Sequence, residues 1–311
     1  MKSSHQILKR HPANPIITPD DMPFRCYTVM NAGATMFNNK VLLLLRVEDC
    51  MRLTNFYVAT SDDGVNFDIS SEPINYPLSV TEEITGPGNR FDMRITRFED
   101  GKYYCFHANW LDKYGCCLGL ATTEDFINFK PLYHLSEPSN RNAVLFPEKI
   151  NGMYVRLDRP QNTSDSGSIW VSYSYDMEFW GRSMPLDMPK NNWSRKKCGA
   201  STVPVKTEKG WLEIYHGVDS TCSTDNYYLG VMLLDLNDPS KIIAAPRSMI
   251  FASEEIYECV GQTPNVVFTS GAVLMPDGTY NIYYGGADTR MCLAQTTVDE
   301  LVNYCIEYDG K

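Results

Sequence analysis

An acidic side chain, Asp92, lies between two arginines, Arg90 and Arg94. The loop Gly86-Pro87-Gly88 precedes this stretch and the strand-like run Ile95–Tyr104 follows it, which predicts that Asp92 lies where a strand begins. A carboxylate held by guanidinium groups is either part of a structural ion pair or a reactive acid. The residue types alone favour the ion pair, because structural networks also perturb carboxylates. The elements that carry the other charged side chains decide between these interpretations.

Two kinds of segment alternate along the chain. The first has two apolar runs around a polar or glycine-containing turn, a pattern typical of hairpins, and it occurs at residues 33–44, 95–106, 144–157, 203–216 and 272–284. The second is a strand that ends in small or polar residues before an acidic turn, and it occurs at residues 57–67, 118–129, 169–180, 229–236 and 291–301. A repeat of roughly 50–60 residues with about four strands is typical of a β-propeller.

We therefore predict an all-β fold, a five-bladed β-propeller that forms a single catalytic domain over residues 1–311. Short helices are expected only near residues 253–257 and 297–304. A pair of β-sandwiches is the alternative, but it gives no reason for five matched repeats.

Charged and polar residues begin or end the hairpin segments, and equivalent positions in a propeller converge on one axis. They are Asn31, Arg46, Asp92, Arg94, Arg141, Arg156, Arg159, Lys197, His216 and Asp288. Several cations around one cavity need an anion, and phosphate or sulfate suits arginine and lysine. With one candidate histidine and no cluster of carboxylates, we expect no metal site. The 19 Tyr, 13 Phe and 5 Trp residues suit sugar rings, so the set points to glycosyl transfer.

The composition of the chain limits the classes of ligand that the protein is expected to bind. The 311 residues carry a net charge of −10, which makes nucleic acid and anionic membrane surfaces improbable ligands. No apolar run approaches the ~20 residues of a membrane helix, and the polar first residues contain no signal peptide. The ten cysteines form no C-x-x-C pair, so we expect reduced thiols in a cytoplasmic protein.

Four stretches carry a family resemblance that runs from His11-Pro12-Ala13-Asn14-Pro15-Ile16 to Asp288. They are residues 92–96, 141–152, 210–218 and 283–289. In order along the chain they resemble glycoside hydrolase family 130, the inverting β-mannoside phosphorylases and their relatives. The resemblance implies a five-bladed propeller, in agreement with the repeat count. Met93 departs from the family pattern, in which proline often follows the acid.

The resemblance also implies a mechanism. Asp92 is the sole catalytic acid and protonates the glycosidic oxygen through the 3-hydroxyl of the mannose. Inorganic phosphate is the co-substrate in place of a catalytic base, no other cofactor is needed, and attack at C1 with inversion gives α-mannose 1-phosphate. The implied phosphate ligands are Arg141, Arg156, Lys197, His216 and Tyr215. The implied mannose contacts are Asn31, Arg46, Arg94 and Asp288.

Several alternatives stay open at this point. Lys196 is the alternative to Lys197, and an inverting β-mannosidase would need Glu213 or Asp288 as its base. A non-catalytic, sugar-binding propeller is a third alternative. Arg156 with Leu145-Phe146-Pro147 favours β-1,4 over β-1,2 linkages. The sequence does not determine whether the acceptor sugar is mannose, glucose or N-acetylglucosamine. It also does not determine whether the protein forms a homo-oligomer.

Overall fold

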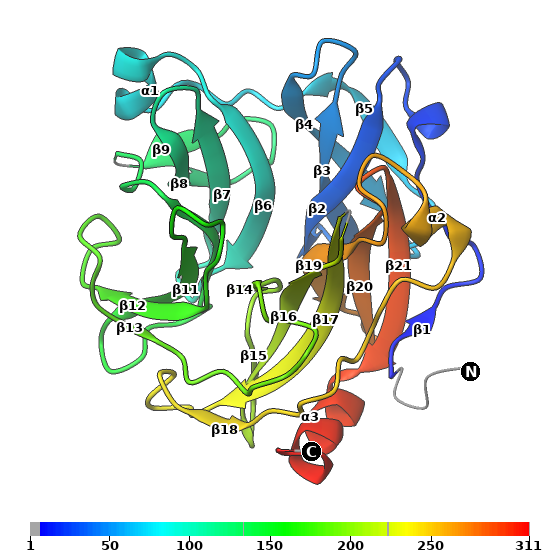
Figure 1. Cartoon of the computed structure of the whole chain (residues 1–311). Coiled ribbons are helices and arrows are strands. Elements are labelled where there is room, and N and C mark those ends of the chain that lie inside the picture. Colours follow the sequence, from blue (N-terminus) through cyan, green and yellow to red (C-terminus); the bar gives the residue numbers. More distant parts are fainter. Residues whose placement is uncertain (1–6, 133, 223, 311) are drawn as a thin grey trace.

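The computed structural model describes residues 7–132, 134–222 and 224–310 and has five antiparallel sheets around a central axis (Figure 1). The predicted five-bladed β-propeller is therefore confirmed. Blade 1 consists of β2 (Thr28–Phe37), β3 (Lys40–Glu48), β4 (Thr54–Ser61) and β5 (Asp68–Pro73). Blade 2 consists of β6 (Asn89–Arg97), β7 (Tyr103–Leu111), β8 (Gly115–Thr123) and β9 (Lys130–Leu132). Blade 3 is β10 (Asn140–Leu145), β11 (Tyr154–Pro160), β12 (Trp170–Ser174) and β13 (Gly181–Pro185).

Blades 4 and 5 complete the ring. Blade 4 consists of β14 (Lys197–Ala200), β15 (Val205–Thr207), β16 (Gly210–Ser220), β17 (Asp225–Leu234) and β18 (Ile242–Ala244). Blade 5 consists of β19 (Val267–Leu274), β20 (Thr279–Gly286), β21 (Arg290–Thr297) and β1 (Lys9–Arg10). Strand β1 supplies the outer strand of blade 5, where Lys9 pairs with Gln295, so the two ends of the chain close the propeller. Arg10 then binds the fully buried Glu258 at 2.8 Å, which fixes this closure.

Helices are few and short: η1 (Pro19–Asp21), α1 (Val80–Thr85), α2 (Ile256–Cys259) and α3 (Val298–Glu307). Helices α2 and α3 lie where the sequence predicted helices. Helix α1 was not predicted, although its signal is present: the Ser79 hydroxyl accepts from the Glu82 amide and the Glu82 carboxylate binds Ser79 in return, a capping box. No helix among the described residues is long and apolar enough to cross a membrane.

The acidic turns of the repeat join the third and fourth strands of a blade. In blades 1, 2 and 3 the carboxylates of Asp63, Asp125 and Asp176 each accept two backbone N–H groups from residues two and three positions ahead. These hydrogen bonds fold the turn locally. The repeated acidic residues therefore have a structural role in the turns. Candidate catalytic residues are instead expected on the strands near the axis.

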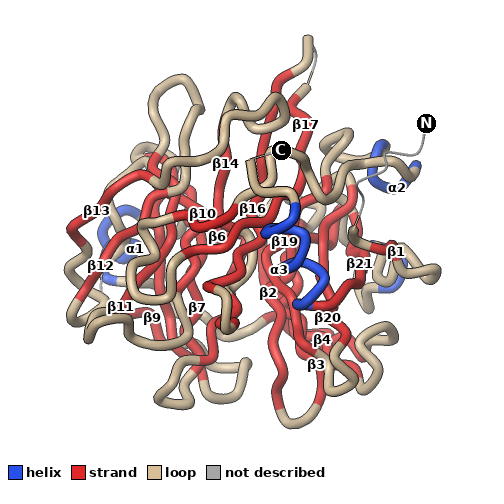
Figure 2. Tube along the Cα trace, turned by 90° about the horizontal axis from the view of Figure 1, so that it is seen from below, coloured by secondary structure: helices blue, strands red, loops and turns tan. Residues whose placement is uncertain are grey.

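The first strands of the blades, β2, β6, β10, β14 and β19, lie together in the middle of the molecule (Figure 2). In β2, β6 and β10 the register shifts by a bulge, and the bulge residues are Asn31, Asp92 and Asn142. Their φ angles of 48°, 53° and 60° lie in the left-handed region, which Asn and Asp tolerate better than other side chains. Three successive blades therefore present a polar side chain from the same kind of bulge.

Blade 4 differs from the expected hairpin. Its inner strand is divided into β14 and β15, which both pair with β16. Pro204 lies in the interruption, where it has no N–H group to offer to a neighbouring strand. Apolar side chains pack between adjacent blades, as where Leu42 and Leu44 meet Met93 and Ile95, and hold the inner strands in place.

Candidate active site

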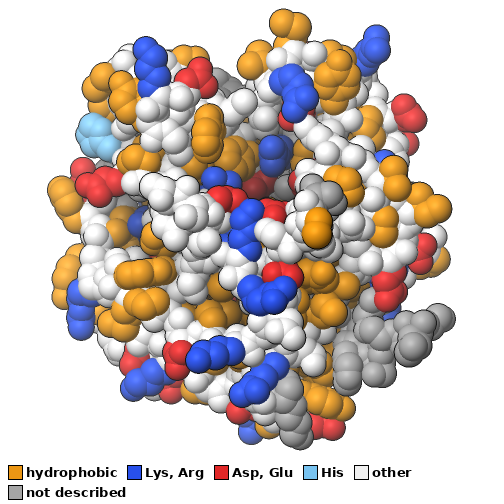
Figure 3. All heavy atoms as spheres, in the orientation of Figure 1, with side chains coloured by type: hydrophobic (Ala, Val, Ile, Leu, Met, Phe, Trp, Pro, Cys, Tyr) orange, Lys and Arg blue, Asp and Glu red, His pale blue; other side chains and the backbone are white. Residues whose placement is uncertain are grey.

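A cavity of about 290 Å³ lies at the end of the axis where the inner strands begin. Its lining residues are Asn31, Arg46, Phe91, Asp92, Arg141, Asn142, Arg159, His216, Tyr227, Val266, Phe268 and Asp288. Figure 3 shows acidic and basic side chains gathered in the hollow between the blades. All five blades, or the loops next to them, contribute to this lining, as expected for a propeller site.

Asp92 is held by residues of blade 1. Asn31 Nδ2 and Arg46 Nη1 both donate to Asp92 Oδ1, over 3.1 Å and 3.0 Å. Oδ2 accepts no hydrogen bond from the residues that the structure describes. The Asp92 side chain is 13% exposed. One oxygen thus fixes the orientation of the carboxylate, and a substrate hydroxyl can approach the other.

Neither arginine next to Asp92 in the sequence binds its carboxylate, so the interpretation of Asp92 as an acid between two guanidinium groups was wrong. Arg90 binds Glu82 with Nε and Nη2, over 2.9 Å and 2.8 Å, and its guanidinium lies 3.9 Å from the ring centroid of Tyr76. The bulge at Asp92 and the alternation of side chains in β6 direct these three residues to different surroundings.

Arg94 lies beneath the cavity and does not line it. Its Nη1 donates to the backbone oxygen of Asp92 at 3.1 Å, and its Nη2 donates to that of Ala200 at 3.4 Å. Burial lowers the pKa of Arg94 to about 10, while the carboxylates of Asp92 and Glu213 oppose this effect. Arg94 therefore supports the bulge of Asp92 from below, where it is out of reach of a sugar in the cavity.

The opposite side of the cavity is basic. Arg141 forms no ion pair among the described residues, and its Nε has no hydrogen-bond partner there. Burial lowers the pKa of Arg159 to about 10, and the charge of Arg141 adds to this shift. Two guanidinium groups that repel each other without a carboxylate between them leave room for an anion.

His216 completes this basic side as a neutral group. Burial, followed by the charge of Arg159, holds the pKa of His216 well below its usual range. Arg159 Nη1 donates a hydrogen bond to His216 Nε2 over 2.8 Å, while His216 Nδ1 lies 2.9 Å from Ser201 Oγ. A Cβ atom on Gly199 would lie 2.7 Å from His216 Cε1, so this glycine allows the imidazole its position.

Arg156, predicted as a phosphate ligand, does not line the cavity. Its Nε donates to Asp158 Oδ2 at 2.9 Å, and its guanidinium lies 4.2 Å from the ring centroid of Trp180. Side chains alternate along β11, so Arg156 and Arg159 are on opposite faces of the strand. Arg159, the register partner of Arg141, has the position in the cavity that the sequence analysis gave to Arg156.

Tyr215 is also outside the cavity. It is fully buried between blades, its ring centroid is 5.5 Å from that of Trp193, and its hydroxyl has no hydrogen-bond partner among the described residues. Alternation along β16 turns Tyr215 away from the face that carries His216. Tyr227, from β17, lines the cavity instead.

The two candidate lysines bind aspartates at the edge of the site. Lys197 Nζ is 2.5 Å from Asp165 Oδ2, and Lys196 Nζ is 2.7 Å from Asp225 Oδ2. Burial lowers the pKa of Lys197, and Arg159 contributes to this shift. Lys197 is thus the lysine whose charge acts on the basic side of the cavity, although it does not line the cavity itself.

Two further carboxylates were candidates for a base. Asp288 lines the cavity, where burial raises its pKa, Arg46 opposes the rise and Asp92 adds to it. Asp288 therefore belongs to the same side as Asp92. Glu213 is fully buried, accepts the Ser201 amide at 3.1 Å, and does not line the cavity. No group of three His, Cys, Asp or Glu residues suited to a metal occurs among the described residues.

Sequence reasoning missed Phe91, Asn142, Tyr227 and Phe268 as lining residues. Asn142 could have been found, because Asn-Ala-Val at 142–144 repeats the Asn-Ala-Gly at 31–33 within equivalent inner strands. The three aromatic residues carry no such signal. Phe91 lies under two cations, since the guanidinium groups of Arg46 and Arg141 are 5.1 Å and 6.0 Å from its ring centroid.

The central cavity of this five-bladed propeller has a carboxylate on one side and arginines on the other. These are features of a carbohydrate-active enzyme. The family model Glyco_hydro_130, described as beta-1,4-mannooligosaccharide phosphorylase, matches residues 7–307. The chain therefore belongs to this enzyme family, as its motifs predicted.

Relatives with two different linkages are equally similar in sequence. The chain is 35% identical to the β-1,4-mannooligosaccharide phosphorylase of Ruminococcus albus over 308 residues, 96% of this chain and 90% of that protein. It is 35% identical to a β-1,2-mannobiose phosphorylase of Thermoanaerobacter sp. over 307 residues, 92% and 96% of the two chains. The solved β-1,2-mannobiose phosphorylase of Listeria innocua, in complex with β-1,2-mannobiose, has a TM-score of 0.86 at 27% identity, over 96% and 99% of the two chains.

Proposed function

We propose that the protein cleaves β-mannosides with inorganic phosphate and inversion, and releases α-mannose 1-phosphate and a shortened sugar. The observation that carries this proposal is the division of the cavity into two sides. Asp92 and Asp288 are on one side with Asn31 and Arg46. Arg141 and Arg159, which form no ion pair with the described residues, are on the other side. An inverting displacement needs an acid and a nucleophile on opposite faces of the sugar ring.

Asp92 is the acid in this proposal. Its Oδ1 accepts from Asn31 and Arg46, which leaves Oδ2 to exchange a proton with the substrate. Following the family mechanism, the proton passes to the glycosidic oxygen through the 3-hydroxyl of the mannose. Asp288 binds sugar hydroxyls next to Asp92. General acid catalysis of this kind contributes typically 10²–10⁴-fold to the rate.

Phosphate binds on the basic side. Arg141 and Arg159 offer guanidinium donors, the Asn142 amide adds a further donor, and Lys197 contributes charge from the edge of the site. Neutral His216 holds Arg159 through Nε2, which orients that guanidinium toward the anion. Phosphate is already an anionic nucleophile, so the site has to position it rather than remove a proton from it.

Hydrolysis is the less favoured alternative on chemical grounds. An inverting hydrolase needs a carboxylate base opposite the acid, with about 6.5–9.5 Å between the two groups and a water molecule in between. Asp288 is on the Asp92 side of the cavity and Glu213 is buried below it. Guanidinium groups occupy the side where the base would have to be.

A phosphate-dependence assay tests the reaction. The protein is incubated with β-1,4-mannobiose with and without phosphate, and products are identified by ³¹P NMR and sugar chromatography. We expect equal amounts of mannose and α-mannose 1-phosphate, only when phosphate is present. Release of two mannose molecules per bond, independent of phosphate, would instead identify a hydrolase.

The substrate of the proposal is a β-1,4-linked mannooligosaccharide or mannosyl-glucose. Leu145-Phe146-Pro147 and the description of the matching family model, beta-1,4-mannooligosaccharide phosphorylase, support the β-1,4 linkage. A parallel assay with β-1,2-mannobiose tests it, since the β-1,4 isomer should be the better substrate. Synthesis from α-mannose 1-phosphate with mannose, glucose and N-acetylglucosamine then identifies the acceptor.

A further inference from the structure

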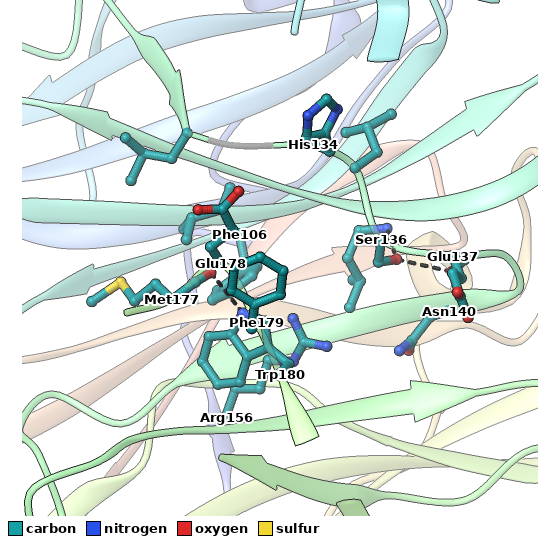
Figure 4. Close-up of a pocket in the computed structure, with 14 residues that line it drawn as sticks. Phe106, His134, Ser136, Glu137, Asn140, Arg156, Met177, Glu178, Phe179 and Trp180 are labelled. Carbon is teal, nitrogen blue, oxygen red and sulfur yellow. Dashed lines mark hydrogen bonds between the residues drawn. The ribbon is translucent and has the colours of Figure 1, made fainter. Parts of the chain in front are cut away.

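A second cavity, of about 430 Å³, lies between blades 2 and 3 (Figure 4). Strands β8 and β9 and residues 134–137 form one wall, and the turn between β12 and β13 forms another. None of its lining residues lines the catalytic cavity. Its volume is within the usual range of small-molecule sites.

Arg156 provides this cavity with hydrogen-bond donors. The residue is 7% exposed, and its Nε is bound by Asp158 at 2.9 Å. Its two Nη atoms form no hydrogen bond with the described residues. Figure 4 shows the guanidinium beside Trp180 at one end of the cavity, with Ser136 and Asn140 across from it. A buried cation with unfilled donors points to a ligand with hydrogen-bond acceptors.

The charges around the cavity favour a neutral ligand. Asp158 is buried against Arg156 and balances its charge. Glu137 and Glu178 are exposed at the edge and add negative charge. An inorganic anion would be repelled by the carboxylates of Glu137 and Glu178, and the charge of Arg156 is already neutralised by Asp158. Hydroxyl groups have no such penalty, because they donate to carboxylates and accept from a guanidinium.

The remaining lining is apolar and aromatic. Phe179 is 75% exposed at the edge of the cavity, Trp180 stacks under Arg156, and Phe106 lies deeper, 5.7 Å from the same guanidinium. Leucines of β8 and β9 complete this surface. A sugar ring has a face of C–H groups and an edge of hydroxyl groups, so it matches an aromatic surface bordered by planar polar side chains.

We propose that this cavity is a second, non-catalytic binding site for an uncharged oligosaccharide. That the sugar is a β-mannoside rests on the proposed function. Trp180 and Phe179 stack on the sugar, the Nη atoms of Arg156 donate to its hydroxyls, and Glu178 accepts from them. An oligosaccharide bound here is held on the protein that carries the catalytic cavity, which raises its effective concentration there.

Calorimetry with β-1,4-mannotriose in phosphate-free buffer tests the site. The wild-type protein should bind the sugar at two sites, and the double substitution Arg46→Ala/Asp288→Ala should abolish only the catalytic one. In that background, Phe179→Ala should weaken the remaining site at least fivefold. Tyr175→Ala is the matched control, because Tyr175 is 75% exposed on the same turn but does not line the cavity. It should leave the affinity unchanged.

Specific outcomes would overturn the inference. They are a single binding site in the wild type, equal effects of Phe179→Ala and Tyr175→Ala, or inorganic phosphate that binds the double variant and displaces the sugar. Saturation-transfer NMR on wild type and Phe179→Ala gives the same comparison should the double variant fold poorly. The phosphate-dependence assay is separate: its failure would contradict the proposed function, whereas loss of the Phe179-dependent binding would contradict only the second site.

Discussion

Arg46 Nη1 lies 3.0 Å from Asp92 Oδ1, across the boundary between blades 1 and 2. The two residues are 46 positions apart in the sequence, and the contact joins the second strand of one blade to the first strand of the next. Asn31, from the first strand of blade 1, donates to the same oxygen. The orientation of the proposed acid therefore depends on how two blades pack against each other, whereas Arg90 and Arg94 do not bind its carboxylate.

Asp92→Asn should remove activity and preserve the fold. Asp92 has a φ of 53°, and Asn31 and Asn142 already occupy equivalent bulges with similar angles, so asparagine suits the backbone there. An amide cannot donate the proton that the leaving group needs, and we expect kcat to fall by about 10³-fold or more. Steady-state kinetics and thermal unfolding measure the two effects. Asp92→Ala is the control that should also lower Tm. An Asp92→Asn enzyme within tenfold of wild type would rule out the acid role.

Arg159→Gln and Arg156→Gln should differ in their effect on phosphate. Arg159 lines the catalytic cavity and Arg156 lines the second one. A hydrogen bond to a charged group is worth about 1.5–3 kcal/mol, so loss of Arg159 should raise the KM for phosphate at least tenfold. Arg156→Gln should leave that KM within about twofold. The opposite order of effects, measured as initial rates at varied phosphate, would show that the sequence-based choice of Arg156 was right.

The repeats made the fold predictable, because hairpin turns and acidic turns are local signals that depend on neighbouring residues. For the site, the types of residue could be predicted from the sequence, but not which of several similar residues faces the cavity. Arg156 and Arg159 have the same chemistry, and which one faces the axis depends on the register of β11 with β10, a non-local property. Tyr215 and Tyr227 pose the same problem on the two central strands of blade 4.

The bulges explain why the neighbours of Asp92 were misleading. A regular strand would put Arg90, Asp92 and Arg94 on one face, because side chains alternate with a period of two. The inserted bulge residue breaks that alternation, so the three side chains diverge. The sequence carries a sign of the bulge only when the inner strands are compared, since Asn31, Asp92 and Asn142 are all residues that tolerate positive φ.

Gly285→Ala should lower activity through Asn31. A Cβ atom at position 285 would lie 2.2 Å from Asn31 Oδ1, which is closer than real contacts allow. Asn31 must then move, and its 3.1 Å hydrogen bond to Asp92 is weakened. Loss of one such bond to a charged group corresponds to about a tenfold or larger drop in kcat/KM. Gly181→Ala is the matched control, because nothing lies within 4 Å of its added Cβ atom. Equal kinetics for both variants would contradict this role of Asn31.

His107 should make the fold less stable in acid. It is buried in strand β7 of blade 2, where the Tyr76 hydroxyl lies 2.7 Å from its Nε2. Burial, with a contribution from Arg90, lowers the pKa of His107 to about 4, whereas an unfolded histidine has a pKa of about 6.5. Between these values the unfolded chain binds a proton that the native protein does not, so the free energy of unfolding decreases as the pH falls.

The decrease amounts to about 1.4 kcal/mol per pH unit, or about 2 kcal/mol between pH 6.5 and pH 5. His107→Gln removes this titration and also loses a hydrogen bond, which costs the same at every pH. Urea unfolding at pH 7 and pH 5 should therefore find that the stability deficit of His107→Gln is about 2 kcal/mol smaller at pH 5. A deficit that stays constant between the two pH values would mean that His107 takes up its proton in the folded protein, and that its burial does not keep it neutral.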